Sequence, residues 1–160
     1  MKTRSARTLA LAMITAALAQ AASAALPTGQ EKALVDRGRY LVSIAGCNDC
    51  HTPGYAQAAG NVPESSWLTG DRLGWRGPWG TSYALNLRLY MANMSEKQWL
   101  HRVATMQSRP PMPYFNLQAM TERDQRALYH YIRALGPAGE PAPAWMPPNK
   151  LPPMPYAQMP

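Results

Sequence analysis

Apolar side chains recur at helical spacing in three segments of the chain, and each segment predicts an α-helix. The first segment covers residues 30–45, where Leu34, Leu41 and Ala45 share one face with Gly38. A glycine inside a helix costs up to ~1 kcal/mol relative to alanine. We therefore expect another element to approach this helix closely at Gly38.

The second segment covers residues 96–107 and starts with two recognisable signals. Ser95 and Gln98 occupy the N-cap and N3 positions of a capping box. Met94 and Trp99 fit a hydrophobic staple across the same turn. Together these signals predict that the helix begins directly after Ser95.

The third segment covers residues 122–135. Thr121 is placed to cap its start, while Gly136 and Pro137 are placed to end it. The residues of its apolar stripe recur at helical spacing: Leu128, Tyr131, Ile132 and Leu135.

The rest of the chain shows no sustained period. Residues 52–93 are rich in Gly, Pro, Trp and Tyr, and a loop of this length is reasonable when it wraps a large group that is not protein. Residues 137–160 hold nine of the 16 prolines, which favours an extended, mobile tail. The pattern predicts an all-α fold of three main helices with long irregular loops.

The N-terminus has the layout of a secretory signal peptide. Three basic side chains precede an apolar run at residues 9–19, and residues 22–24 read Ala-Ser-Ala, an A-x-A cleavage site. The apolar run is shorter than the ~20 residues of a membrane span, although an uncleaved N-terminal anchor stays open as an alternative. We expect residues 1–25 to be a signal peptide, 26–136 a folded domain and 137–160 a proline-rich tail. The mature protein would then be exported, in a bacterium to the periplasm, with no integral membrane segment.

Composition narrows the possible functions. The 160 residues suit one domain, and the net charge of +7 falls to +4 once residues 1–25 are removed. The remaining basic residues are scattered, whereas a nucleic-acid-binding protein concentrates them in a patch. Only two cysteines are present, which excludes a multi-bridge disulfide scaffold and a four-cysteine zinc site.

Both cysteines belong to one motif. Residues 47–51 read Cys-Asn-Asp-Cys-His, the C-x-x-C-H attachment signal of a c-type haem. At this spacing, Cys47 and Cys50 can each add to one haem vinyl group, and His51 can supply an imidazole nitrogen to the iron. The rival interpretations are a redox-active disulfide, for which no βαβ pattern precedes the motif, and a zinc site.

Met112 is the predicted second axial ligand of the iron. Three prolines flank it, and the stiff backbone that they create can hold a thioether sulfur in place. Its main competitor is Met154, because residues 110–114 recur identically as residues 152–156. Met91 and Met120 stay open as alternatives, without a supporting local pattern. His101 and His130 lie on the polar sides of their helices, and we expect both to be solvated.

The chain resembles the class I cytochrome c domain over residues 30–136. The resemblance is carried by the following segments: 38–41 before the motif at 47–51, Met112-Pro113, and 128–132 in the last helix. Residues 77–87, Gly-Pro-Trp-Gly-Thr-Ser-Tyr-Ala-Leu-Asn-Leu, look more narrowly like the cytochrome subunits of periplasmic alcohol and sugar-acid dehydrogenases. Those subunits usually carry three haem motifs and a membrane anchor, where this chain shows one motif and no anchor.

The resemblance implies a cytochrome c fold around one covalent haem, with the first and last helices crossing near Gly38. It implies that loop donors bind the haem propionates, and the candidates are Trp79, Tyr83, Asn86 and Arg76. It also suggests a carbonyl near Pro63 as the acceptor for the His51 ring N–H.

The function implied by the resemblance is electron transfer with redox protein partners, such as a periplasmic dehydrogenase, a terminal oxidase or another cytochrome. The alternatives are a haem enzyme or gas sensor with a labile sixth ligand, and a dedicated subunit of a dehydrogenase complex.

Overall fold

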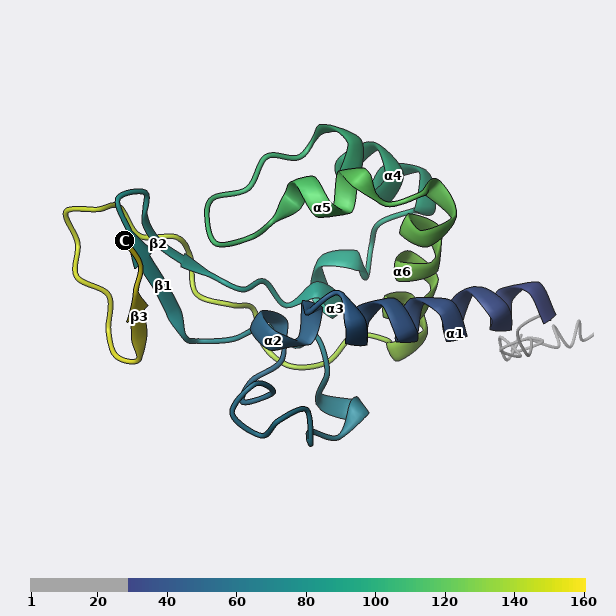
Figure 1. The fold of residues 1–160 in the computed structure, drawn as a ribbon, viewed down its shortest axis with the longest axis horizontal. Helices are drawn as coiled ribbons and strands as arrows, with labels where there is room; N and C mark the ends of the chain where they lie inside the picture. Colours follow the sequence, from purple (N-terminus) through teal and green to yellow (C-terminus); the bar gives the residue numbers. More distant parts are fainter. Residues whose placement is uncertain (1–28) are drawn as a thin grey trace, which may run out of the picture.

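The structure, a computed structural model, describes residues 29–160, so the predicted signal peptide lies outside the described residues. The helices are α1 (Gly29–Ile44), α2 (Cys47–His51), α3 (Leu87–Met91), α4 (Glu96–Thr105), α5 (Tyr114–Ala119) and α6 (Glu122–Leu135), with a 3₁₀ turn at Glu64–Ser66. The strands are β1 (Gly74–Gly77), β2 (Gly80–Tyr83) and β3 (Tyr156–Gln158). The three predicted helices correspond to α1, α4 and α6, and the architecture is mainly helical as expected (Figure 1).

Helices α1 and α6 cross in close contact, as Figure 1 shows. A Cβ atom on Gly38 would lie 2.0 Å from the carbonyl oxygen of Ala127 and 2.5 Å from the Cβ of Tyr131. No side chain fits in that space, so the backbones approach each other only because residue 38 is glycine. The close approach expected at Gly38 is confirmed.

The core lies between this crossing and α4. Val42, Leu128 and Ile132 are buried along the crossing, and Trp99 and Val103 of α4 join the same cluster. The Trp99 Nε1 donates a hydrogen bond to the Gln125 carbonyl at 2.7 Å, which fixes α4 against α6. In residues 29–160, no helix has both the length and the hydrophobicity that crossing a bilayer requires.

The predicted caps at the start of α4 and at both ends of α6 are confirmed. Ser95 and Gln98 form both hydrogen bonds of the capping box at the start of α4. The Thr121 hydroxyl accepts a hydrogen bond from the Asp124 amide at 3.2 Å, and Gly136 follows α6 with a φ of +68°. Helix α4 ends at Thr105, two residues before the predicted end.

A small sheet was not predicted. Strands β1 and β2 form an antiparallel hairpin, and β3 pairs with β1 in parallel, giving the order β2-β1-β3. The strands have only three or four residues, too few for an alternating pattern to emerge. The third strand also comes from far along the chain, and pairing of that kind leaves no local signal.

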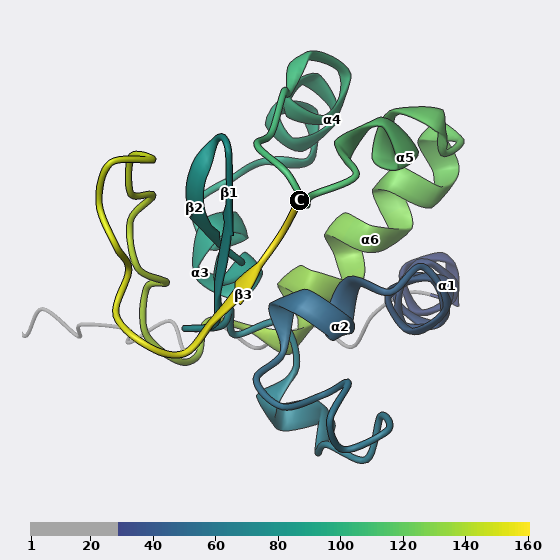
Figure 2. The same ribbon diagram turned by 60° about the vertical axis from the view of Figure 1, so that its left-hand side comes forward.

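The prediction of a mobile tail is wrong for the described structure. After α6 the tail lies along both edges of the β1–β2 hairpin (Figure 2). On one edge Met146 exchanges two backbone hydrogen bonds with Thr81, of 2.8 and 3.0 Å. On the other edge the Met159 amide donates to the Arg76 carbonyl at 2.7 Å. An extended proline-rich segment still carries enough free amides and carbonyls to pair with exposed strand edges.

Candidate cofactor site

Helix α2 places both thiols of the C-x-x-C-H motif on one short turn. Cys47 and Cys50 are three residues apart, the spacing at which helical side chains are neighbours, and both are free and partly buried. Burial raises the pKa of Cys47 to about 11, and it also raises the pKa of Cys50. A redox-active C-x-x-C pair depends on a lowered thiol pKa. The pKa of neither thiol is lowered in that way.

His51 ends α2 and is held in one orientation. Its Nδ1 lies 2.7 Å from the carbonyl oxygen of Leu85, and only 8% of the residue is exposed. A carbonyl only accepts, so Nδ1 carries the hydrogen and Nε2 of the neutral ring keeps a lone pair. Burial lowers the pKa of His51, although the hydrogen bond to Leu85 opposes that shift. The ring is thus in the form that ligates a metal.

The acceptor of the His51 ring N–H is Leu85, and the suggested carbonyl near Pro63 was wrong. The loop after α2 is instead tied to the motif by other bonds. The Gly70 amide donates to the His51 carbonyl at 2.8 Å. The Thr52 hydroxyl donates to the Asn48 side chain at 2.7 Å and accepts from the Leu68 amide at 2.8 Å.

Buried polar side-chain atoms without a hydrogen-bond partner gather in one part of the described chain. Five such atoms occur in residues 29–160: Asn48 Nδ2, Trp75 Nε1, Trp79 Nε1, Thr81 Oγ1 and Ser82 Oγ. One belongs to the C-x-x-C-H motif and four to the β1–β2 hairpin. Buried polar groups are normally paired, and each exception calls for an explanation. Unpaired donors beside a haem-attachment motif fit a large group that carries carboxylates.

The structure places the four predicted propionate residues in or near this hairpin. Trp79 has its ring N–H buried and unpaired. The Arg76 guanidinium donates to the Lys150 carbonyl at 2.8 Å, and the Tyr83 hydroxyl lies 3.6 Å from the Met146 sulfur. Their contacts with a haem stay predictions.

Asn86 already uses its side chain within the protein. Its oxygen accepts from the Leu89 amide at 3.0 Å, capping α3, and its nitrogen donates to the Ala138 and Glu140 carbonyls. The residue is 4% exposed. Trp75 and Ser82 were missed as candidates. The register pairs them across the hairpin, and no sequence signal distinguished them from their neighbours.

Met112 lies in the loop between α4 and α5. It is partly buried and packs against the core, whereas Met154 is 76% exposed. In Figures 1 and 2 this loop lies above α2, with the hairpin beside both. The positions of the two methionines therefore favour Met112 over its twin, and its bond to iron stays a prediction.

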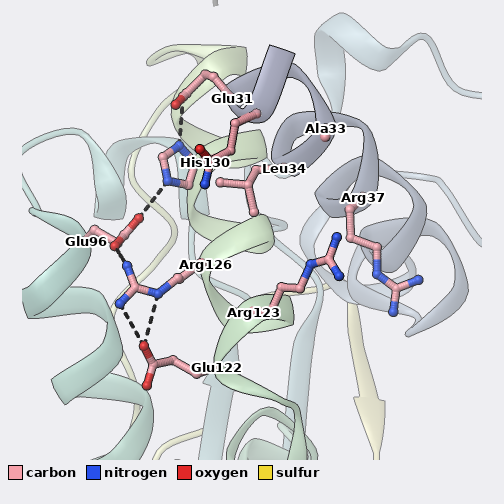
Figure 3. Close-up of a pocket in the computed structure, with 10 residues that line it drawn as sticks. Glu31, Ala33, Leu34, Arg37, Glu96, Glu122, Arg123, Arg126 and His130 are labelled. Carbon is pink, nitrogen blue, oxygen red and sulfur yellow. Dashed lines mark hydrogen bonds and ion pairs between the residues drawn. The ribbon is translucent and has the colours of Figure 1, made fainter. Parts of the chain in front are cut away.

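A separate polar pocket of about 740 Å³ lies between α1, α4 and α6 (Figure 3). His130 was expected to be solvated, yet its side chain is 18% exposed. It lies between the carboxylates of Glu31, at 2.7 Å, and Glu96, at 2.6 Å. Arg126 pairs with Glu96 and Glu122 in the same network. The polar side of α6 faces the starts of α1 and α4, so His130 lies among carboxylates instead of in solvent.

A mainly helical fold around a C-x-x-C-H helix defines the class of c-type cytochromes. The sequence model of the Cytochrome c family matches residues 35–136, well over half of the chain, and the protein belongs to this family. Comparisons with curated proteins and with solved structures give no significant match.

Membership of the family confirms the expected cytochrome c fold and makes the protein a haem-based electron-transfer protein. It implies haem c as the cofactor, and Cys47 and Cys50 lie with His51 in the C-x-x-C-H spacing. That the two thiols would hold the haem and that His51 would ligate the iron stay predictions. The residues present fit this group. The thiol pair, the oriented imidazole and the unpaired hairpin donors are the features that such a cofactor requires of the chain.

Proposed function

We propose that this protein is exported and carries single electrons between a periplasmic dehydrogenase and a respiratory acceptor. In this proposal it holds one covalent haem, whose iron is ligated by His51 and Met112. One observation carries the proposal. The C-x-x-C-H motif folds as a single helical turn whose histidine is locked by the Leu85 carbonyl at 2.7 Å. Export is proposed from the basic, apolar and small-residue pattern of residues 1–25.

The residues have separate tasks in this proposal. Cys47 and Cys50 anchor the cofactor as thioethers, so it stays with the protein after export to the periplasm. His51 presents Nε2 to the iron, and its ring cannot rotate away because Nδ1 is bonded to Leu85. The bound haem supplies one-electron chemistry, and a methionine ligand raises its potential.

A site closed by two protein ligands favours an electron carrier over an enzyme, because no position is left for a substrate. The partner encounter is expected to be weak and steered by charge. The resemblance of residues 77–87 to dehydrogenase cytochrome subunits makes an alcohol or sugar-acid dehydrogenase our proposed donor.

The test of the iron ligands is a matched pair of variants. Met112→Ala should abolish the weak red absorption band that marks methionine sulfur on ferric haem. Met154→Ala removes the same residue from the same local sequence, and the band should survive because Met154 is exposed. The opposite result would assign the ligand to Met154.

The competing function, a haem enzyme or gas sensor, predicts a different spectrum. Its wild-type iron would be high-spin and five-coordinate, and the ferrous protein would bind carbon monoxide rapidly. The proposed carrier should be low-spin and should bind carbon monoxide only after Met112 leaves the iron.

A further inference from the structure

We propose that Trp145 of the tail is a positioning residue for the loop between α4 and α5, residues 106–113, which we call the Met112 loop. Trp145 holds this loop in the position seen in the structure, which we call closed. The inference rests on the proposed function, because it concerns the loop that would carry the sixth iron ligand. It adds a role for the proline-rich tail, which follows the segment matched by the Cytochrome c family.

The indole of Trp145 connects two segments, and within residues 29–160 no hydrogen bond or ion pair joins these segments directly. Its Nε1 donates a hydrogen bond to the Trp79 carbonyl, in the β1–β2 turn, at 3.0 Å. The Arg109 guanidinium lies over its ring, with Cζ 4.2 Å from the centroid. This is cation–π contact distance. Trp145 therefore joins the hairpin to the loop between α4 and α5.

The backbone around Trp145 fixes its position. The next residue, Met146, is bonded through both its amide and its carbonyl to Thr81. Gly80 has a φ of +97°, and a Cβ there would lie 2.2 Å from the Met146 carbonyl and 2.9 Å from Trp145 Nε1. Only glycine at residue 80 lets the tail approach this closely. The ring is thus held against the hairpin, and the exposed Arg109 side chain packs onto it from the loop.

Because Arg109 lies close to Met112 in the chain, its contact with Trp145 also limits where Met112 can move. Only Pro110 and Pro111 separate it from Met112, and each proline fixes φ near −65°. In residues 29–160 the Arg109 side chain has no other hydrogen bond or ion pair, so its contact with Trp145 is the restraint on this side chain. The start of the loop is also held by the Gln118 side chain, whose Nε2 donates to the Met106 carbonyl at 3.1 Å. Losing the contact should raise the fraction of molecules whose loop is open.

The expected change in loop opening follows from the strength of one cation–π contact at a partly exposed site. Such a contact changes an open–closed equilibrium by about fivefold. An added ligand binds only the open form, so its apparent affinity rises by the same factor.

The experiment measures imidazole binding to the ferric holoprotein and hydrogen exchange of residues 106–113. Trp145→Ala and Arg109→Ala should each tighten imidazole binding about fivefold and speed exchange in this segment. The double variant should show no further gain, because both changes remove one contact. Trp145→Phe keeps the ring over Arg109 and should show a smaller change. Arg102→Ala, which removes one charge from the exposed end of α4, is the control and should change neither readout.

Unchanged imidazole affinity and exchange in Arg109→Ala would overturn the proposal, and so would additive effects in the double variant. Arg109→Ala leaves the tail's backbone bonds intact, so it answers the question even if Trp145→Ala detaches the tail. A wild-type protein without the methionine band would contradict Met112 ligation itself, a failure distinct from that of Trp145. In that case the exchange rates of residues 106–113 still decide whether Trp145 holds the loop.

Discussion

The α1–α6 crossing and the β1–β2 hairpin differ in how completely protein atoms fill and pair them. At the crossing, protein atoms fill the contact so closely that Gly38 leaves no room for a methyl group. In the hairpin, four side-chain polar atoms are buried without a partner. The crossing is packed entirely by protein atoms, whereas the hairpin keeps buried polar atoms that a bound cofactor would pair in our proposal.

The two regions also differ in what holds them. The crossing depends on two helices whose patterns are visible in the sequence. The hairpin depends on the tail, which contributes β3 on one edge and Met146 on the other. Variants in the two regions should therefore fail in different ways.

The largest effect should come from Gly38→Ala. The added Cβ would lie 2.0 Å from a backbone oxygen that cannot move alone, so α1 and α6 must separate. We expect a loss of about 3 kcal/mol or more in the free energy of unfolding, at the upper end for overpacking. Denaturant titration measures it. Gly29→Ala is the control, since nothing lies within 4 Å of its Cβ. An equal loss of unfolding free energy in Gly29→Ala would show that the crossing does not explain the loss in Gly38→Ala.

Gly80→Ala should have the next largest effect and a local one. The residue has a φ of +97°, and its new Cβ would meet the Met146 carbonyl. We expect a loss of about 2 kcal/mol from backbone strain and lost tail contacts. Limited proteolysis should cut the tail faster while the far-ultraviolet helical signal stays. Loss of helix and tail together would contradict the separation of the two regions.

Trp75→Phe tests the hairpin as a lining. If the bound cofactor accepts from the Trp75 N–H, the holoprotein should lose about 1 kcal/mol of stability when that donor is removed. If the N–H stays unpaired, removing it should leave stability unchanged or increase it. Trp99→Phe is the matched control, because its N–H has a partner within the protein, the Gln125 carbonyl.

The smallest effect should be a pH dependence at the crossing. The Arg37 guanidinium, 2.9 Å from Asp124, lowers the pKa of that carboxyl. A lowered pKa in the folded state adds stability above the ordinary value of about 3.9, and this is lost as pH falls through the folded value. Asp124→Asn should therefore be slightly less stable than wild type at pH 7 and equal to it in strong acid. A difference that persisted in acid would point to packing instead.

Much of the scaffold could be predicted because its causes are local. The capping signals at Thr121 and Gly136 predicted the bounds of α6, the capping box predicted the start of α4, and Gly38 marked the crossing. The same logic failed for His130, because the polar side of a helix can face carboxylates from other helices as well as water.

The site was only partly predictable. The C-x-x-C-H motif identified α2, since its chemistry depends on side chains that are adjacent in sequence. The acceptor for His51 is a main-chain carbonyl, and every residue has one, so Leu85 carried no signal. Likewise, Trp145 reaches Arg109 and Trp79 only because the tail folds back over the hairpin, a contact between distant segments.

The most direct test of the central claim is the intact mass of the purified protein after acid–acetone extraction. The account predicts that one haem-sized increment stays with the chain and maps to the peptide that holds residues 47–51. A chain without that increment, with the haem recovered in the extract or never present, would contradict covalent attachment at Cys47 and Cys50.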